Sequence, residues 1–428
     1  ATLTRRAIDD RTSDIHIEPE FEETRVRFRV DGVLNKSLVL PSKVQRAVIA
    51  RVKILAGIKL DEKRKPQDGR FSATINGRRV DFRVSTMPVY YGEKAVLRIL
   101  DSERSSVTLE DLGMNDSQLS YVKRAASAPF GMILITGPTG SGKSTTLYAM
   151  LNEVDRDKKN VLSLEDPVEY NIKGVSQSQM RPEIGYTFAA GIRSVLRQDP
   201  DIIMVGEIRD KETAQLAVQA ALTGHLVLST LHTNNAAGAV PRLVDMGVDP
   251  YLLAPTLDLI VAQRLVRRIC PDSGKKTPIE GPIKRMIEEE FADLPKKYHE
   301  ELLPDSKEVL AIQPSANCPT GTRGRLGVYE MLEINDEIRA AILDGGEEDK
   351  VSSIARQHGM ITLKEDTIIK SMKKLIPWEE VAQIGGLMDL EAEFGSGDDE
   401  EEGAEDADEK GDEDEKKDNI KTNELDLV

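Results

Sequence analysis

The hydrophobic pattern changes from alternating to nearly continuous at about residue 100. Over 24–32, three apolar residues alternate with three arginines and an Asp-Gly pair follows, which predicts a strand with one buried face. Over 42–57, apolar residues at helical spacing begin at Ser42, the expected N-cap, and end at Gly57, which predicts a helix. Further strands are expected at 70–77, 78–88 and 93–101. Together these elements predict a small α+β domain at 1–100.

After a polar connector at 101–110, short and almost wholly apolar runs alternate with helical segments over 111–268. Runs of this kind suit the strands of a parallel sheet that helices cover on both faces. The expected strands are 132–136, 160–165, 201–207 and 225–231. The pattern therefore predicts an α/β fold class for the larger part of the chain.

Beyond residue 268 the chain is more polar. We expect a separate region at 269–330, followed by C-terminal helices at 331–394. Helical patterns are visible at 334–345 and 377–394.

The negative charge of the chain is concentrated in its last residues. From Asp398 onward there are 16 Asp or Glu and 4 Lys, so this segment carries −12 of the net −16, and −4 remains for all other residues. A segment of this composition cannot bury an apolar core. We expect a disordered acidic tail at 395–428, which either solubilises the chain or docks to a basic partner. The remaining charge gives no basic footprint for nucleic acid.

Two observations bear on the compartment. No apolar run approaches the roughly 18 residues that span a bilayer, and no signal-peptide pattern opens the chain. The two cysteines, Cys270 and Cys318, suggest no disulfide framework and fit a reducing cytoplasm. Because the chain begins with Ala1, we expect the N-terminus to be processed, trimmed or preceded by a further segment.

The stretch 137–145, GPTGSGKST, lies between an expected buried strand and a helix start. Its spacing is that of the P-loop, in which glycines let backbone N–H groups approach phosphate oxygens. The lysine then reaches the β- and γ-phosphates, and the serine hydroxyl holds Mg²⁺. The alternative is a glycine-rich turn that binds nothing. The expected nucleotide-binding residues are Gly137, Pro138, Thr139, Gly140, Ser141, Gly142, Lys143, Ser144 and Thr145.

Two carboxylates are expected beside the phosphates. Glu207 and Glu165 each follow or end an expected parallel strand, and ligands bind beyond the carboxyl ends of such strands. One acid can prime the attacking water while the other helps to position the ion. We expect Glu207, Glu165 and Lys143 to be catalytic, and Ser144 and Glu207 to hold Mg²⁺ with ATP. Either acid alone could be a solvated strand end.

His225 and His232 bracket the last of the expected parallel strands. Such positions suit γ-phosphate sensing through hydrogen bonds that rearrange when the phosphate leaves. A structural role in the fold is the alternative for each of them.

Four collinear segments resemble the secretion ATPase superfamily of type II secretion and type IV pilus systems. They are GPTGSGKST, LSLEDPVEY, LRQDPDIIMVGEIRD and LTGHLVLSTLHTN, and further similarity extends over about residues 10–390. The resemblance implies a RecA-like P-loop ATPase core after a PAS-like α+β domain. It also implies a cytoplasmic homo-hexamer that uses ATP and Mg²⁺ to move an inner-membrane platform protein, to which it is peripheral.

The resemblance also assigns five arginines to the nucleotide or the subunit interface. Arginines near the γ-phosphate stabilise transition-state charge and couple hydrolysis to domain closure. Surface ion pairs are the alternative for each. The residues are Arg70, Arg83, Arg193, Arg197 and Arg209.

Assembly and secretion members carry a four-cysteine zinc insertion, which this chain has only in degenerate form. Ser273 and Ser315 stand where two of the cysteines are expected, beside Cys270 and Cys318. Structural zinc needs four ligands. We therefore expect no zinc, and an insertion that keeps its shape by packing alone. The resemblance also implies an additional N-terminal docking domain, and we expect either that it was trimmed from this sequence or that this member lacks it.

The resemblance implies an ATP hydrolase that drives pilus or pseudopilus assembly, without deciding between a type IV pilus and type II secretion. A conjugation-type DNA-transport ATPase and a nucleotide-binding scaffold without turnover are the alternatives from other classes.

Overall fold

The computed structural model describes residues 2–75, 77–101 and 107–384, so the acidic tail predicted at 395–428 lies outside the described residues. Part of the connector at 101–110 and the end of the helix predicted at 377–394 lie outside them too. None of the described helices is both long and apolar enough to cross a membrane.

The N-terminal residues form an antiparallel sheet of six strands in the order β3-β2-β1-β6-β5-β4. The elements are α1 (Thr2–Asp9), β1 (Asp14–Pro19), β2 (Glu23–Val30), β3 (Val33–Pro41), α2 (Ser42–Ala56), β4 (Gln67–Ile75), β5 (Arg78–Val89) and β6 (Gly92–Asp101). The helix predicted at 42–57 is confirmed, and Gly57 closes it at φ 68°. The expected cap is wrong by one residue, because Pro41 is the N-cap and Ser42 already lies in the helix.

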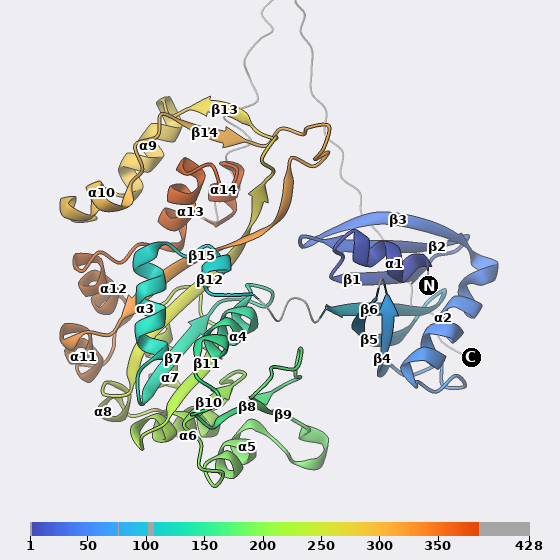
Figure 1. Ribbon diagram of the computed structural model, residues 1–428, viewed down its shortest axis with the longest axis horizontal. Coiled ribbons are helices and arrows are strands. Elements are labelled where there is room, and N and C mark those ends of the chain that lie inside the picture. The colour runs from blue at the N-terminus through green and yellow to red at the C-terminus, as the bar shows by residue number, and fades with distance from the viewer. Residues whose placement is uncertain (1, 76, 102–106, 385–428) are drawn as a thin grey trace, which may run out of the picture. The chain divides into compact units, whose positions relative to one another are not determined.

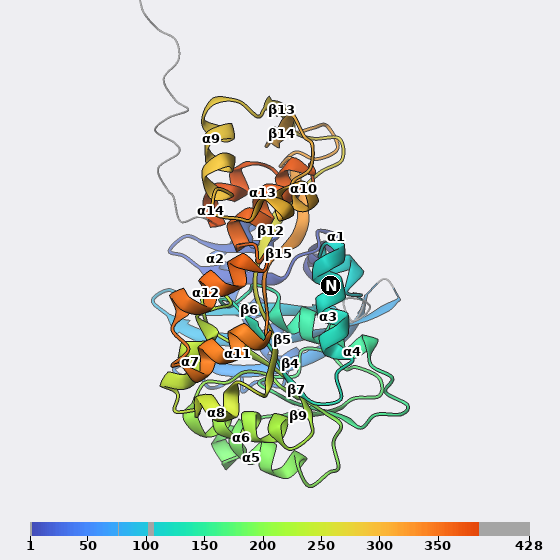
Figure 2. The ribbon, with the colours of Figure 1, turned by 90° about the vertical axis from the view of Figure 1, so that its left-hand side faces the viewer.

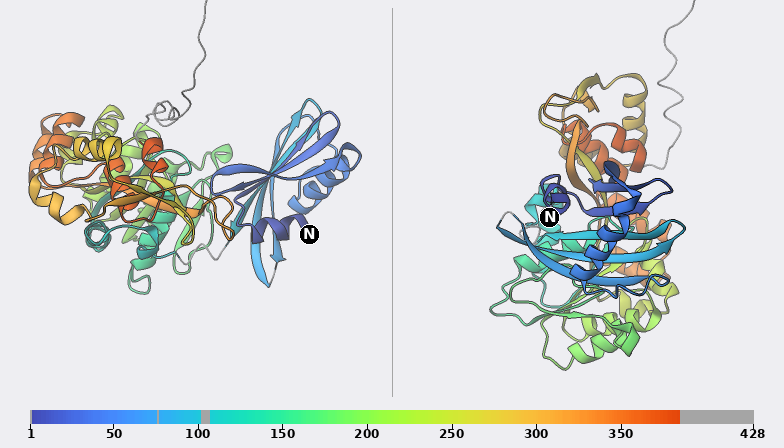
Figure 3. Two further views of the ribbon diagram at one scale, coloured as in Figure 1. Left: turned by 90° about the horizontal axis from the view of Figure 1, so that it is seen from above. Right: turned by 90° about the vertical axis from the view of Figure 1, so that its right-hand side faces the viewer.

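Alternation along these strands separates an apolar face from a polar one. Val26 and Phe28 of β2 are buried, and they belong to one cluster with Ile49 and Val52 of α2. The right-hand view in Figure 3 shows α2 lying against the sheet. The arginines that alternate with the apolar residues of β2 point to the opposite face. This polar face contributes residues to the pocket described below.

The larger sheet has seven strands in the order β15-β12-β7-β11-β10-β8-β9. Its strands are β7 (Gly131–Thr136), β8 (Val161–Glu165), β9 (Ser176–Gln179), β10 (Ile202–Val205), β11 (Leu226–Leu231), β12 (Leu257–Ile269) and β15 (Thr322–Glu333). All neighbours pair in parallel except β12 and β15, which are antiparallel. The four predicted strands are β7, β8, β10 and β11. The sequence did not predict β9, β12 or β15, because β9 has no apolar residue and charged residues interrupt the apolar runs of β12 and β15.

Helices cover both faces of this sheet (Figure 1). On one face lie α3 (Asp116–Ala126) and α4 (Lys143–Glu153). On the other lie α5 (Phe188–Val195), α6 (Lys211–Leu222), α7 (Ala239–Asp245), α8 (Pro250–Leu253), α11 (Asp336–Leu343) and α12 (Glu348–Gln357). In β7, Ile133 and Ile135 pack with the first group, and Met132 and Leu134 with the second. Because both faces are covered, the strand is buried along its whole length.

A further cluster forms at one end of the long strands β12 and β15 (Figure 2). It combines α9 (Gly281–Glu290), α10 (Lys296–Leu302), α13 (Leu363–Met372), α14 (Glu379–Ile384) and the two-stranded sheet of β13 (Lys275–Pro278) and β14 (Glu308–Ala311). The chain leaves β12 into this region and returns from it to β15. The apolar residues of this region form a core of their own, around Phe291 and Ile368.

A disulfide bond closes the neck of this region and corrects two expectations. Cys270 and Cys318 are bonded to each other across a separation of 48 residues. The expectation of no disulfide is therefore wrong, and so is the expectation of packing alone. Ser273 donates a hydrogen bond to Ser315 at 3.0 Å beside the disulfide. The pairing was missed because two cysteines 48 residues apart become neighbours only when β12 and β15 pair.

Replacing both cysteines by serine is expected to lower the free energy of unfolding by about 4 kcal/mol, because the unfolded chain gains the freedom of a long open loop. Denaturant unfolding of the parent, with and without a dithiol reductant, measures the effect. The reduced parent should match the Cys270→Ser/Cys318→Ser variant. Equal midpoints for the oxidised parent and the double variant would contradict the prediction.

Candidate functional site

Three glycines shape the loop between β7 and α4. Gly137, Gly140 and Gly142 have φ of 144°, 84° and 91°, which residues with a Cβ rarely adopt. At Gly137 a Cβ would stand 2.5 Å from the carbonyl oxygen of Gln263, whereas at Gly140 it would meet open space. Gly140 is thus required for its backbone angles, and Gly137 for close packing as well.

Gln263 of β12 holds this loop in place, and the sequence did not single it out. Its Nε2 donates to the carbonyl of Ser141 at 2.9 Å, and its Oε1 accepts from Thr146 at 2.8 Å. The side chain is 1% exposed, so these bonds are shielded from water. Both ends of one amide therefore tie β12 to the loop and to the first turns of α4.

Lys143 is the first residue of α4 and folds back over the loop. Its Nζ donates to the carbonyls of Gly137 at 2.8 Å and Pro138 at 3.1 Å. Burial lowers the pKa of the Lys143 ammonium, while the nearby Glu207 carboxylate acts in the opposite direction. The ammonium lies inside the loop, as expected for a group that meets phosphate oxygens.

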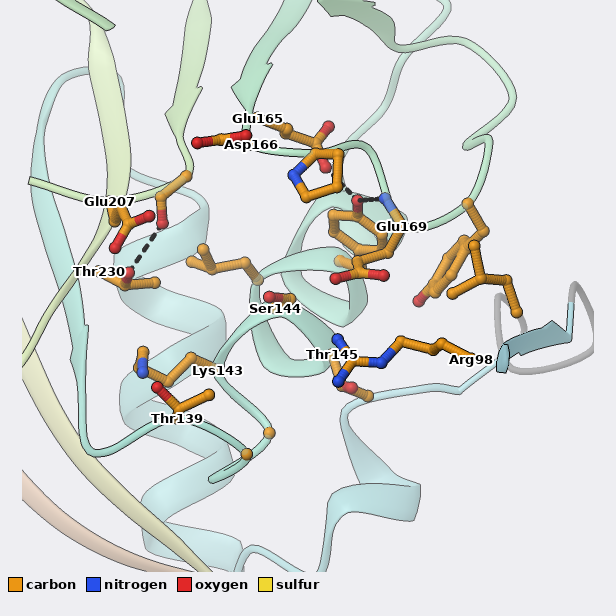
Figure 4. A pocket seen from close by; sticks show the side chains of 18 of the residues that line it. Arg98, Thr139, Lys143, Ser144, Thr145, Glu165, Asp166, Glu169, Glu207 and Thr230 are labelled. Atoms are coloured by element: carbon orange, nitrogen blue, oxygen red, sulfur yellow. Dashed lines mark hydrogen bonds between the residues drawn. The ribbon is translucent and has the colours of Figure 1, made fainter. Parts of the chain in front are cut away.

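Glu207 follows β10 at the carboxyl edge of the sheet. Thr230 of the neighbouring β11 donates to the Gly206 carbonyl at 2.7 Å, and Ile208 donates its N–H to the Thr230 carbonyl at 3.0 Å. These two bonds fix the segment that carries Glu207, and Figure 4 shows the one that Thr230 donates. The carboxylate lies 2.6 Å from Arg209 and 3.5 Å from His232.

Glu165, the last residue of β8, is more enclosed than Glu207 and is 4% exposed. One carboxylate oxygen accepts from Ser163 at 2.5 Å and from Gln177 at 3.0 Å. The other accepts from the hydroxyl of Tyr148, which lies on α4. Hydrogen bonds to an enclosed carboxylate fix its orientation.

These residues surround a pocket of about 750 Å³ at the carboxyl edge of the sheet (Figure 4). The predicted residues that line it are Thr139, Gly140, Gly142, Lys143, Ser144, Thr145, Glu165, Glu207, Arg209 and His232. The lining residues that the sequence did not single out include Asp14, Arg29, Arg98, Tyr148, Glu169 and Thr230. The volume suits a ligand the size of a nucleotide.

The donor set fits a polyphosphate chain with a magnesium ion. The Ser141 hydroxyl is buried inside the loop and has no hydrogen-bond partner among the described residues, so it can donate to a ligand. Magnesium in proteins is usually held by one or two side chains together with phosphates and water. Ser144 and Glu207 line the same pocket and supply a hydroxyl and a carboxylate. Within the described residues no group of three or more His, Cys, Asp or Glu could hold a metal by itself.

The structure separates the two predicted histidines. His232 follows β11 and lines the pocket beside Glu207. His225 precedes β11, where its Nδ1 lies 2.8 Å from the Ala220 carbonyl at the end of α6. The six residues of β11 place its two ends, and therefore the two histidines, about 20 Å apart. The expectation that His225 meets the phosphates in this pocket is therefore wrong, because it lies at the opposite edge of the sheet.

Four of the five predicted arginines, Arg70, Arg83, Arg193 and Arg197, do not line the pocket. Arg193 of α5 pairs with Glu212 of α6. Arg197 donates to the carbonyl of Arg193 at 2.5 Å. Both stay predictions, since their exposed ends leave them free to meet another subunit. Arg209 lines the pocket and pairs with Glu207.

Cross-strand register places three arginines in one row on the polar face of the N-terminal sheet. Arg70 of β4 stands opposite Arg83 of β5, which stands opposite Arg98 of β6. Like charges in such positions repel each other. At one end of the row, Asp14 of β1 reduces the repulsion, because its carboxylate accepts a hydrogen bond from Arg98 at 3.0 Å.

Arg83 pairs with the loop that follows β8, through the Val168 carbonyl and the Glu169 carboxylate. Arg70 does not line the pocket, so its predicted role remains a prediction. Arg98 lines the pocket, and the sequence could have pointed to it only through strand register.

Comparison with known proteins places these features in context. The family model described as "Type II/IV secretion system protein" matches residues 1–383. The chain is 43% identical over 394 residues to "Type II secretion system protein E" of Pectobacterium carotovorum subsp. carotovorum, covering 90% of this chain and 74% of that protein. It is 43% identical over 380 residues to "Type IV pilus assembly ATPase PilB" of Myxococcus xanthus, covering 88% and 65%.

A solved structure shows the same architecture. The "Pilus Retraction Motor PilT and Bound ADP" is similar with a TM-score of 0.60 and 27% sequence identity, covering 89% of this chain and 95% of that one.

Lys143→Ala is expected to weaken ATP binding about 30- to 140-fold, since a charge-assisted hydrogen bond contributes about 2–3 kcal/mol. The variant should remain folded, because Lys143 is only partly buried and belongs to neither apolar cluster of the larger sheet. Titration calorimetry with a nonhydrolysable ATP analogue measures the affinity. Lys158→Ala, which removes an exposed lysine paired with Asp155, is the control. An unchanged affinity in Lys143→Ala would contradict the assignment of this loop.

Proposed function

The chain belongs to the type II/IV secretion system protein family, and we propose that it uses Glu207, Glu165 and Lys143 to hydrolyse ATP during pilus or pseudopilus assembly. It is an ATP hydrolase of the P-loop class, with an α/β fold built on a parallel sheet core. The observation that carries the proposal is the meeting of the glycine loop, Lys143 and Glu207 in one pocket.

The loop residues Gly137–Thr145 bind the triphosphate. The N–H groups at the start of α4 donate to its oxygens, together with the Ser141 hydroxyl, which has no other partner among the described residues. Lys143 exchanges its contacts with two loop carbonyls for contacts with the β- and γ-phosphates. Because burial lowers the pKa of Lys143, the arriving phosphate charge also stabilises its protonated form.

Glu207 is the group that accepts a hydrogen bond from the attacking water. Its carboxylate lines the pocket close to Lys143. Arg209 and His232 lie against it and hold its orientation. Glu165 lies deeper and assists by orienting the same region from β8.

Ser144 and Glu207 would hold Mg²⁺ together with the phosphates. A magnesium ion held there would supply positive charge that offsets the negative charge of the phosphate oxygens. We propose no zinc site at the neck of the 269–330 region, because both of its thiols are used in the disulfide.

A homo-hexamer in the cytoplasm, acting on a membrane platform protein, is the assembly that the family supports. The arginines of the polar face, Arg70 and Arg83, approach the phosphates when the N-terminal domain closes, and Arg193 and Arg197 serve the subunit interface. The division into 1–100, 111–268, 269–330 and 331–394, with a PAS-like first domain and a RecA-like core, belongs to the same proposal. The acidic charge of the tail at 395–428, which lies outside the described residues, suits either solubilising the chain or docking a basic partner.

Glu207→Gln is expected to lower kcat for ATP hydrolysis at least 100-fold, because the uncharged amide cannot accept the proton of water. Affinity for a nonhydrolysable ATP analogue should stay within about 3-fold of the parent, since the amide keeps the size of the side chain. Phosphate release under saturating MgATP measures kcat.

Glu153→Gln is the matched control, because Glu153 is an exposed glutamate at the end of α4 and does not line the pocket. It should hydrolyse ATP like the parent. A Glu207→Gln variant as fast as the parent would overturn the catalytic assignment.

A further inference from the structure

Tyr148 connects the two elements that carry the site. It lies on α4, a little more than one turn after Lys143 and Ser144, and is 1% exposed. Its hydroxyl donates to one carboxylate oxygen of Glu165, the last residue of β8. The hydroxyl oxygen also accepts the N–H of Glu169 at 3.3 Å. One phenol therefore links the helix after the P-loop to the strand and loop that carry Glu165.

The other oxygen of the Glu165 carboxylate is held by residues of β8 and of the neighbouring strand β9. Ser163 and Gln177 donate to its other oxygen at 2.5 and 3.0 Å. Gln177 is itself fixed, because it donates to the Tyr170 carbonyl at 3.1 Å and accepts the N–H of Ile172 at 2.7 Å. These donors come from β8 and β9. Among the hydrogen bonds of the described residues, Tyr148 is the contact that ties the carboxylate to the P-loop helix.

The ring of Tyr148 has its own support. It packs edge-on against Tyr170, with ring centroids 4.5 Å apart, and belongs to the apolar cluster of α3 and α4. Burial and the nearby Glu165 carboxylate raise the pKa of the Tyr148 hydroxyl, so it stays protonated and can only donate to Glu165. Replacing the tyrosine by phenylalanine keeps the ring and removes the donor alone.

We propose that Tyr148 is a positioning residue for ATP hydrolysis, whose hydroxyl holds the Glu165 carboxylate in one orientation relative to the P-loop helix. The proposal rests on the role of Glu165 in the proposed function. Without this donor, the carboxylate is held through one oxygen only, by Ser163 and Gln177, and can rotate about that contact. Binding of ATP does not depend on that orientation, because the phosphates are held by the loop and Lys143.

Tyr148→Phe in the full chain should therefore lower kcat about 10-fold, as is usual when the partner of an active-site group is removed. The KM for ATP should stay within 2-fold of the parent. A purely structural role would lower the unfolding temperature and leave kcat per folded protein unchanged. Thermal unfolding and active-site titration with a nonhydrolysable ATP analogue are measured alongside. Tyr186→Phe is the matched control, since its hydroxyl lies 2.7 Å from Ser178 of β9 and not on Glu165; it should retain parental kcat.

A double-mutant cycle separates this inference from the proposed function. Glu165→Gln should lower kcat strongly, and adding Tyr148→Phe should cause less than a 2-fold further change, because Tyr148 acts through Glu165. If Tyr148→Phe keeps the parental kcat while Glu165→Gln is slow, the inference about Tyr148 is overturned and the proposed role of Glu165 stands. A parental kcat in Glu165→Gln overturns the role of Glu165 and the inference with it. A full 10-fold further loss in the double variant shows that Tyr148 acts by another route, and overturns the inference as well.

Discussion

The parallel register of β8, β10, β11 and β7 is the constraint on which the site depends. Backbone hydrogen bonds align these strands so that their carboxyl ends meet at one edge of the sheet. Four short apolar runs can take this arrangement only because helices cover both faces. Four different strands lead into the glycine loop, Glu165, Glu207 and His232. The pairing of these strands alone brings the four groups together. Each strand carries one functional group to a common point.

Polar side chains from neighbouring elements fix the exact positions of the functional groups that the sheet brings together. Gln263 fixes the loop from β12, Thr230 fixes the backbone beside Glu207 from β11, and Tyr148 fixes Glu165 from α4. In each case a neighbouring element holds the functional segment by a buried or half-buried hydrogen bond. The lower dielectric of the interior strengthens such bonds, and it also makes an unpaired partner costly. The site is therefore rigid on the sheet side, while the buried Ser141 hydroxyl has no partner among the described residues.

The sequence was sufficient where the chemistry is local. The glycine spacing, Lys143 and Ser144 form one continuous stretch, and Glu207 follows a strand that is apolar throughout, so both could be predicted. His225 was misplaced because a strand with histidines at both ends puts only one of them at the functional edge. The Cys270–Cys318 bond, the row of Arg70, Arg83 and Arg98, and the contacts of Tyr148 and Gln263 depend on register and on pairing of distant segments. No periodicity within one segment could reveal them.

The central claim is that a triphosphate is held by the loop at 137–145 with its terminal group between Lys143 and Glu207. A crystal structure of the chain with Mg²⁺ and a nonhydrolysable ATP analogue tests it most directly. The account predicts the γ-phosphate within hydrogen-bonding distance of the Lys143 ammonium, on the side of the pocket that Glu207 lines. An analogue bound elsewhere, or a loop that stays empty at saturating concentration, would contradict it.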